Sequence, residues 1–216
     1  MAKDIEKGGL LTPQNSALVM IDYQPQMFFG VQSVDRQLLI NNIVGLAKAA
    51  KLFHVPTIVT TIAADSFSGP DLPEIEEVFS GVKPIDRTTM NAWEDGRVVD
   101  AVKNTGRNKL IIAGLWTEVC VAFPALSALE DGYEVYVVSD AIGGSSHDSH
   151  KYAMQRMVQA GVIPLTWLQL LLEYQRDWAR SETYDATLDI VRKHAGAYGQ
   201  GVLYVKSMLG KYAKAA

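Results

Sequence analysis

The run Leu110-Ile111-Ile112-Ala113-Gly114-Leu115-Trp116 is short, continuous and apolar, which is typical of a buried β-strand. Thr117 follows it as a candidate N-cap, so the spacing predicts a helix whose first turn carries Cys120. The free N–H groups and the positive dipole end of such a helix would favour the thiolate, which is the nucleophilic form of cysteine. Cys120 is the only cysteine among 216 residues. It is therefore either a nucleophile or a small buried apolar residue.

On both sides of this run, strand patterns alternate with helix patterns along the chain. Strand-like runs at residues 17–21, 55–62, 109–114, 133–138 and 161–166 are separated by helical patterns at residues 34–53, 97–104, 120–130 and 147–160. This alternation predicts an α/β fold, a three-layer α/β/α sandwich with a mainly parallel central sheet. Ligands bind such sheets beyond the carboxyl ends of the strands, where Asp22 and Cys120 both lie.

Two segments do not follow the alternation. Residues 63–94 are rich in glycine and proline, with one expected helix at 73–79, and long irregular segments of this kind usually carry function. Residues 167–195 are expected to be helical, and a break is expected between Gly196 and Gly201.

We expect one domain, residues 1–216, with a helical C-terminal extension at residues 167–216. The extension contains more Leu, Tyr and Trp than one core needs, so we expect it to pack on another copy of the chain and form a homo-oligomer.

Composition excludes several classes of function. The net charge of −4 argues against nucleic-acid and anionic-membrane partners. A single cysteine excludes an intramolecular disulfide framework and a cysteine-based zinc site. The polar N-terminus lacks a signal peptide and no apolar run approaches the roughly 20 residues of a membrane span, so we expect a cytoplasmic protein.

A cysteine nucleophile needs a base to accept its proton, and the usual partner is histidine. His147 and His150 flank the start of a helix after a strand and remain candidates. Asp22 is the alternative base, and Lys83, in the irregular segment, is a candidate cation that would stabilise the charged pair. Taken alone, Lys83 is equally well a surface lysine and Asp22 a loop or capping residue.

The segments Val19-Met20-Ile21-Asp22-Tyr23-Gln24 and Gly114-Leu115-Trp116-Thr117-Glu118-Val119-Cys120-Val121, with Lys83 between them, resemble the isochorismatase-like cysteine hydrolases. That family includes nicotinamidases and N-carbamoylsarcosine amidases. The segment from Cys120 to Tyr133 is similar to the branch related to the bacterial YcaC protein, and the resemblance runs from about Ala17 to Leu165.

The resemblance implies a catalytic triad of Cys120, Asp22 and Lys83. It also implies a cis peptide bond between Leu115 and Trp116, with the backbone N–H groups of Trp116 and Cys120 forming an oxyanion hole. The activity implied is cleavage of an amide-like C–N bond of a small molecule through a thioester. The alternative is a catalytically idle relative that serves as a binding or scaffold subunit of an oligomer. A nucleotide-binding module is disfavoured because phosphate-loop signatures are absent.

Two departures from the family pattern limit what the resemblance implies. Residues 60–69 contain Asp65 but no histidine, so we expect neither the metal of the nicotinamidases nor any other cofactor. Isochorismatases of the enterobactin type lack the cysteine, so Cys120 argues against their chemistry. The substrate is therefore left open.

Several residues near these segments are candidates for the substrate pocket or for shaping the site. Pro124 cannot sit inside a regular helix, so the helix either bends there or begins later. Arg87 is either a carboxylate-binding residue or a member of an exposed ion pair. Candidate pocket residues are the aromatic Phe28 and Trp93, together with Gln24, Asn91 and Thr117, whose side chains can form hydrogen bonds.

Overall fold

The computed structural model describes residues 9–210, and a six-stranded parallel sheet lies at its centre. The strands are β1 (Ser16–Ile21), β2 (Thr57–Ile62), β3 (Ile85–Arg87), β4 (Lys109–Gly114), β5 (Glu134–Val138) and β6 (Ile163–Leu165). Their order in the sheet is β3-β2-β1-β4-β5-β6. The order reverses between β1 and β4, and ligand sites of parallel sheets form at such a switch point.

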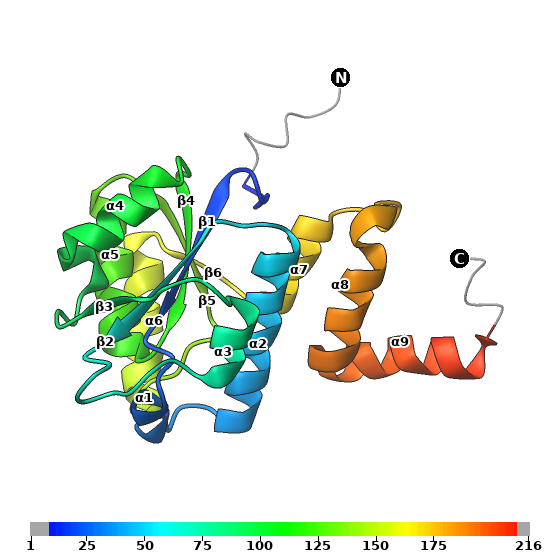
Figure 1. Ribbon diagram of the computed structural model, residues 1–216, viewed down its shortest axis with the longest axis horizontal. Coiled ribbons are helices and arrows are strands. Elements are labelled where there is room, and N and C mark those ends of the chain that lie inside the picture. Colours follow the sequence, from blue (N-terminus) through cyan, green and yellow to red (C-terminus); the bar gives the residue numbers. More distant parts are fainter. Residues whose placement is uncertain (1–8, 211–216) are drawn as a thin grey trace.

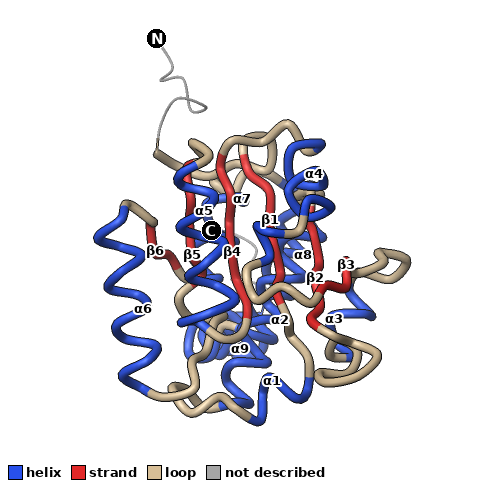
Figure 2. Tube along the Cα trace, turned by 90° about the vertical axis from the view of Figure 1, so that its left-hand side faces the viewer, coloured by secondary structure: helices blue, strands red, loops and turns tan. Residues whose placement is uncertain are grey.

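Helices cover both faces of the sheet, which confirms the predicted three-layer α/β/α architecture (Figure 1). One layer contains α2 (Arg36–Leu52), α3 (Pro73–Val78), α7 (Trp167–Gln175) and α8 (Ser181–His194). The other contains α4 (Gly96–Asn104), α5 (Ala122–Glu130) and α6 (His147–Ala160). The short helix α1 (Pro25–Phe29) follows β1 beyond the end of the sheet (Figure 2).

The two central strands are completely buried and unusually close. Gly114 is paired with Ile21, and a Cβ atom on Gly114 would lie 2.5 Å from the Ile21 carbonyl oxygen. Only glycine fits this position. The register brings the residues that follow the two strands, Asp22 and Leu115, to the same edge of the sheet.

The structure differs from the predicted elements in its shortest segments and at its C-terminus. The three-residue strand β3 and the 3₁₀ turn η2 (Ala92–Glu94) lie in the segment 63–94 that was expected to be irregular, and the short helix α1 was not predicted. The expected break at residues 196–201 is instead the first part of α9 (Gly196–Met208). Gly196 makes the turn with a φ of 53°, and Gly199 packs on the backbone of α8, so these glycines serve a tight helix–helix contact.

Helix α9 projects from the rest of the described structure and packs against α8 (Figure 1). Large apolar side chains on α8, α9 and the loops flanking them are exposed, namely Trp178, Tyr184, Tyr198, Leu203, Tyr204, Val205, Met208 and Leu209. Within residues 9–210, no helix is both long and apolar enough to cross a membrane. The N-terminal residues 1–8, which bear on the signal-peptide prediction, lie outside the described part.

Candidate active site

Asp22 lies at the carboxyl end of β1 in a conformation that aims its side chain into the protein. Its φ is +58°, a left-handed value that aspartate tolerates better than most residues. Its N–H donates to the Thr60 carbonyl oxygen at 2.9 Å, and its side chain is fully buried. The Thr60 hydroxyl lies 3.5 Å from the carboxylate.

A buried arginine holds the Asp22 carboxylate. One terminal nitrogen of Arg87, Nη2, donates to Oδ1 at 2.8 Å and to Oδ2 at 2.7 Å, and neither side chain is exposed. The other terminal nitrogen donates to the Thr89 carbonyl oxygen. This buried pair corrects the idea that Arg87 forms an exposed ion pair. It also imposes a constraint, because removing either partner would leave an uncompensated buried charge.

Lys83 does not join this cluster. It is exposed and precedes β3, whereas Arg87 ends β3 and pairs with Ile62 at the end of β2. Since the strands are parallel, only the end of β3 lies at the edge of the sheet that carries Asp22. The cation beside Asp22 is therefore Arg87, and the expectation for Lys83 is corrected on this point.

Cys120 lies beside Asp22, close enough for the carboxylate to raise the pKa of the thiol by its charge and by hydrogen bonding. It is 2% exposed and lies in a π-helical turn, η3 (Thr117–Val121), that links β4 to α5. The Leu115–Trp116 peptide bond is cis, and the backbone N–H of Trp116 acts to lower the pKa of the Cys120 thiol, against the larger effect of burial. The turn thus places a backbone donor next to the thiol.

The helix start differs from the prediction. No side chain caps η3, because Thr117 is buried and its hydroxyl lies 2.9 Å from His150 Nδ1. Helix α5 begins at Ala122, so Pro124 is in its first turn, where a missing N–H costs no helical hydrogen bond. Of the two alternatives for Pro124, the later start is the one observed.

The electrostatics of the cluster keep the proton on sulfur at neutral pH. Burial raises the pKa of Cys120 to about 12, and the charge and hydrogen bond of Asp22 act in the same direction. Burial also raises the pKa of Asp22 to about 6, against the opposing effects of Arg87 and the thiol. Asp22 is therefore ionised above about pH 6 and Cys120 is a thiol. This corrects the expectation that a helix terminus favours the thiolate at rest.

Two predicted hydrogen-bonding residues of the pocket have their polar atoms engaged within the fold. Gln24 is fully buried and donates to the carbonyl oxygens of Ile62 and Gly69 while accepting from the Ile62 N–H. Asn91 caps η2 and donates to Ser127 and Glu94. Both side chains hold the irregular segment in place, and the structure assigns them no free donor for a ligand.

The aromatic side chains that were predicted to line the pocket, Phe28 and Trp93, also make contacts within the fold. The Trp93 indole N–H donates to Asp131 at 2.8 Å and its ring contacts Tyr133, so it points toward the turn after α5 and away from Cys120. Phe28 is buried against the Tyr23 ring. Trp116 is fixed by α1, because its indole N–H donates to the Met27 carbonyl oxygen at 2.7 Å.

His150 and Glu118 support the turn η3 that carries Cys120, a role that the sequence did not reveal. Glu118 accepts from the backbone N–H and hydroxyl of Ser145, and burial lowers the pKa of His150. His150 contacts Thr117 rather than Cys120, so it supports the turn, and His147 begins α6. Within residues 9–210, no group of three His, Cys, Asp or Glu side chains is placed to hold a metal.

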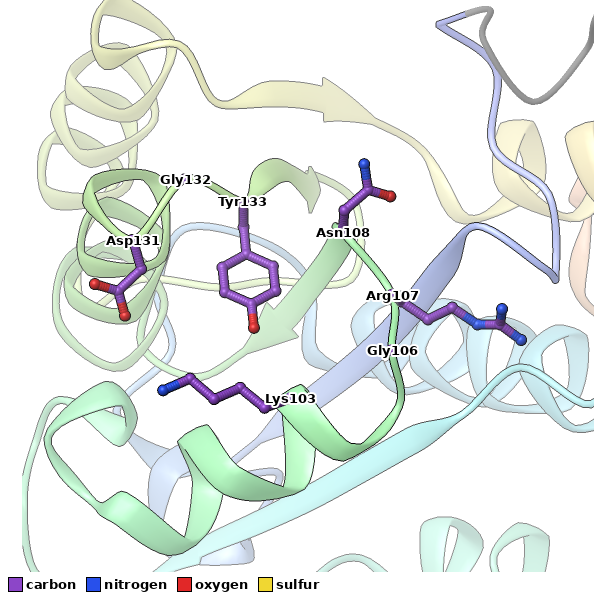
Figure 3. A pocket seen from close by; sticks show the side chains of 7 residues that line it. All are labelled: Lys103, Gly106, Arg107, Asn108, Asp131, Gly132 and Tyr133. Carbon is purple, nitrogen blue, oxygen red and sulfur yellow. The ribbon is translucent and has the colours of Figure 1, made fainter.

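A cavity of about 500 Å³ lies away from this cluster, at the opposite end of the sheet (Figure 3). Its walls are the loop before β4 and the turn before β5. The lining residues are Lys103, Gly106, Arg107, Asn108, Asp131, Gly132 and Tyr133. Lys103 and Tyr133 lie on the side of Asp131, while Arg107 points away from them (Figure 3). Because ligand sites of parallel sheets lie at the carboxyl ends of the strands, we do not place the active site here.

The fold and the cluster of Asp22, Arg87 and Cys120 can now be compared with known proteins. Residues 16–169 match the family model described as the isochorismatase domain. The "Probable hydrolase YcaC" of Escherichia coli is 40% identical over 179 residues, covering 82% of this chain and 86% of that protein.

Two solved YcaC structures have the same fold. The protein from Pseudomonas aeruginosa, solved with hexane-2,5-diol and covalent acrylamide, matches with a TM-score of 0.88 and 36% identity over 92% of this chain and 98% of its own. The E. coli protein, described as an octameric hydrolase of unknown specificity, matches with a TM-score of 0.87 and 36% identity over 94% and 98%. The chain belongs to the isochorismatase family. Within that family, it is similar to the YcaC proteins along most of its length.

We predict that Arg87→Gln destabilises the protein far more than Lys83→Gln. At pH 8 the first change leaves a buried, ionised Asp22 without its cation, which costs about 3–5 kcal/mol of unfolding free energy. The second alters an exposed side chain and should change stability by less than about 0.5 kcal/mol. Urea denaturation of both variants measures the difference. At pH 5 the Arg87→Gln loss should shrink, because Asp22 is then protonated. Equal losses for the two variants at pH 8 would contradict the assignment.

Proposed function

We propose that the protein is a metal-independent cysteine hydrolase that cleaves the C–N bond of a small amide-like molecule through a thioester. The observation that carries the proposal is the buried cluster in which Asp22 is near enough to Cys120 to raise the pKa of its thiol, while Arg87 clamps the Asp22 carboxylate. A nucleophile, a base within reach and a group that orients the base are the parts such a site requires.

In the first half-reaction, Asp22 takes the thiol proton as the Cys120 sulfur attacks the carbonyl carbon. The carbonyl oxygen becomes an oxyanion, and the backbone N–H groups of Trp116 and Cys120 are the proposed donors to it. The tetrahedral intermediate collapses, the C–N bond breaks, and Asp22 returns the proton to the leaving nitrogen. The products of this step are a free amine or ammonia and a thioester on Cys120.

In the second half-reaction, water enters in place of the amine. Asp22 accepts a proton from the water as its oxygen attacks the thioester carbonyl, and the second tetrahedral intermediate releases a carboxylic acid. The proton held by Asp22 returns to the Cys120 sulfur, which restores the resting thiol. Arg87 contacts neither reactant in this scheme and acts as a positioning residue for Asp22.

The pKa values of Asp22 and Cys120 suit their proposed roles as general base and nucleophile. A general base works best when its pKa lies near the operating pH, and burial raises the pKa of Asp22 to about 6. The thiol is neutral at rest, so the proton moves only when an electrophile engages the sulfur. Because Cys120 is 2% exposed, we propose a small substrate.

The relatives support the assignment of the protein as a hydrolase and leave its substrate open. The E. coli relative is named "Probable hydrolase YcaC", and its solved structure is described as that of a hydrolase of unknown specificity. The P. aeruginosa structure carries covalent acrylamide, a small amide-bearing electrophile, which is consistent with a nucleophile accessible to small molecules in that protein. The reducing cytoplasm keeps a single free cysteine in the thiol form, and we propose that compartment.

We predict that hydrolysis rises with pH through about 6. Asp22 must be ionised to act as a base, so the rate should fall as the pH drops below its pKa of about 6. Measuring ammonia release from a panel of small amides and ureido compounds between pH 4.5 and 8.5 gives the profile. Asp22→Asn should lower kcat/KM by about 10²–10⁴-fold and abolish the acid limb.

Two further variants serve as controls for this profile. Cys120→Ala should eliminate hydrolysis, and Asp65→Asn, an exposed carboxylate in the loop after β2, should leave the profile unchanged. A wild-type rate that is flat between pH 4.5 and 8.5, or activity retained by Asp22→Asn, would contradict the mechanism.

We also propose that the protein is a homo-oligomer whose contacts include α8 and α9. The apolar side chains exposed on these helices form the surface described above, and the similar E. coli protein is octameric. An exposed apolar surface of this kind marks an interaction site.

The double variant Leu203→Glu/Tyr204→Glu should reduce the oligomer. Both side chains are at least half exposed on α9, so the change adds charge to the proposed contact without disturbing a core. Sedimentation velocity should show a smaller species for this variant and the wild-type species for the matched control Lys206→Gln, an exposed change on the same helix. A wild-type protein that sediments as a monomer would refute the proposal.

A further inference from the structure

The chain segments beside the proposed catalytic cluster carry no basic side chain. Five segments follow the carboxyl ends of β1 to β5, at the edge of the sheet that carries the cluster: residues 22–35, 63–72, 88–95, 115–121 and 139–146. None of them contains Lys, Arg or His, whereas each contains at least one Asp or Glu. A negatively charged ligand at this edge therefore finds no partner in these segments.

Arg87, which ends β3, contacts the cluster but is not available to a ligand. Its side chain has no solvent exposure, and one terminal nitrogen donates to both oxygens of Asp22. The other terminal nitrogen donates to the Thr89 carbonyl oxygen. The charges of the pair are thus balanced within the fold. A carboxylate brought beside the pair would lose its hydration without gaining a cation, which is unfavourable.

The basic residues that follow these segments lie at the starts of helices. Arg36, Arg97 and His147 are in the first turns of α2, α4 and α6, and all three are exposed. Arg97 is already paired with Asp95 at 2.6 Å. Solvent and salt screen such exposed charges, so they compensate poorly for a carboxylate that is desolvated at the cluster.

Three large apolar side chains are exposed on the same segments. Phe29 is 74% exposed, and Phe67 and Met90 are each 63% exposed. We call Phe29, Phe67 and Met90 the apolar rim. Because they lie in the segments after β1, β2 and β3, which are neighbours in the sheet, all three belong to the edge that carries Asp22.

Contacts of the backbone and of neighbouring side chains tie Phe29 to the turn that carries Cys120. Phe29 ends α1, and the Trp116 indole N–H donates to the Met27 carbonyl oxygen of the same helix at 2.7 Å. A Cβ atom on Gly30, the next residue, would overlap the Trp116 ring. The end of α1 therefore lies against the residue whose backbone N–H is a proposed oxyanion donor.

The other two members of the rim are tied to the cluster in the same way. Phe67 precedes Ser68, whose hydroxyl donates to the sulfur of Met27 in α1 at 3.9 Å. Met90 follows Thr89, whose carbonyl oxygen accepts from Arg87. The apolar rim thus borders the region in which Asp22, Arg87 and Cys120 meet.

We infer that this site admits uncharged molecules with a small apolar substituent and excludes molecules that carry a carboxylate. The missing cation accounts for the exclusion, and the apolar rim accounts for the preferred substituent. The substrate of the proposed hydrolase would then be an uncharged amide of a small aliphatic or aromatic acid. That substrate class rests on the proposed function, whereas the exclusion of carboxylates is a property of the site itself.

Alkylation of Cys120 tests the exclusion without any enzymatic activity. Iodoacetamide and iodoacetate both transfer their carbon to sulfur with loss of iodide, and only iodoacetate is charged. Because the chain has one cysteine, mass spectrometry of the intact protein follows each reaction. At pH 8.5 the rate ratio of iodoacetamide to iodoacetate should be larger by about tenfold or more in the folded protein than in the urea-unfolded protein. Equal ratios, or no modification of the folded protein by either reagent, would overturn the inference.

A charge added to the rim gives a second measurement. Met90→Lys should raise the iodoacetate rate by about threefold or more, and it should leave the iodoacetamide rate within about twofold of the wild-type value. The matched control is Val158→Lys, at an exposed residue near the end of α6 and thus at the opposite edge of the sheet. It should change neither rate. The same iodoacetate rate in both variants would overturn the inference.

Three amides of equal size test the substrate class. We expect kcat/KM for ammonia release to be highest for 4-methylpentanamide, which is apolar, and lower for succinamide, which is polar and uncharged. For succinamate, the carboxylate, it should be lower than for succinamide by about tenfold or more. If succinamate is hydrolysed as fast as 4-methylpentanamide by the wild-type protein and not by Cys120→Ala, the hydrolase proposal stands and the inference is wrong. If ammonia release is the same in the wild type and Cys120→Ala while the alkylation ratio holds, the hydrolase proposal fails and the exclusion of carboxylates stands.

Discussion

The buried ion pair between Asp22 and Arg87 is the interaction on which the site depends. A carboxylate without solvent exposure is stable only with a cation beside it, and Arg87 provides two hydrogen bonds to it from the end of β3. The pair therefore holds the end of β3 close to the end of β1. It also fixes the negative charge beside the Cys120 thiol, because the same carboxylate raises the pKa of that thiol. The Asp22 carboxylate is therefore part of both the fold and the proposed chemistry. The close approach of β1 and β4 at Gly114 brings the residues that follow β4 near this carboxylate.

The charge of Asp22 in this ion pair also helps to explain why the Cys120 side chain is a protonated thiol in the resting protein. A helix N-terminus favours an anion by about 0.3–1 kcal/mol, and the sequence argument for a thiolate rested on that effect. Burial and the negative charge of Asp22 act against the anion and are larger, so the pKa of Cys120 rises to about 12. In the proposed mechanism, the thiolate is therefore formed during attack, by transfer of the thiol proton to Asp22, and is not present beforehand.

The sequence was most informative where long patterns fix the structure and least informative where side-chain direction depends on packing. Long apolar runs predicted the parallel sheet, and their polar ends placed Asp22 and Cys120 at one edge. The sequence left two roles open for Arg87 and did not place it beside Asp22, because β3 has only three residues, too few to show a strand pattern inside an irregular segment. The directions of Trp93 and Asn91 depend on contacts with α5 and the turn that follows it, more than 30 residues away in sequence.

The protonation state of Cys120 in the folded protein distinguishes a resting thiol from a preformed thiolate. Because the chain has one cysteine, labelling with ¹³Cβ-cysteine gives a single NMR signal whose chemical shift reports thiol or thiolate. The account predicts a thiol signal that does not titrate between pH 6.5 and 9, and a lower apparent pKa in Asp22→Asn, where the neighbouring negative charge is removed. A wild-type signal that is already that of a thiolate at pH 7 would contradict it.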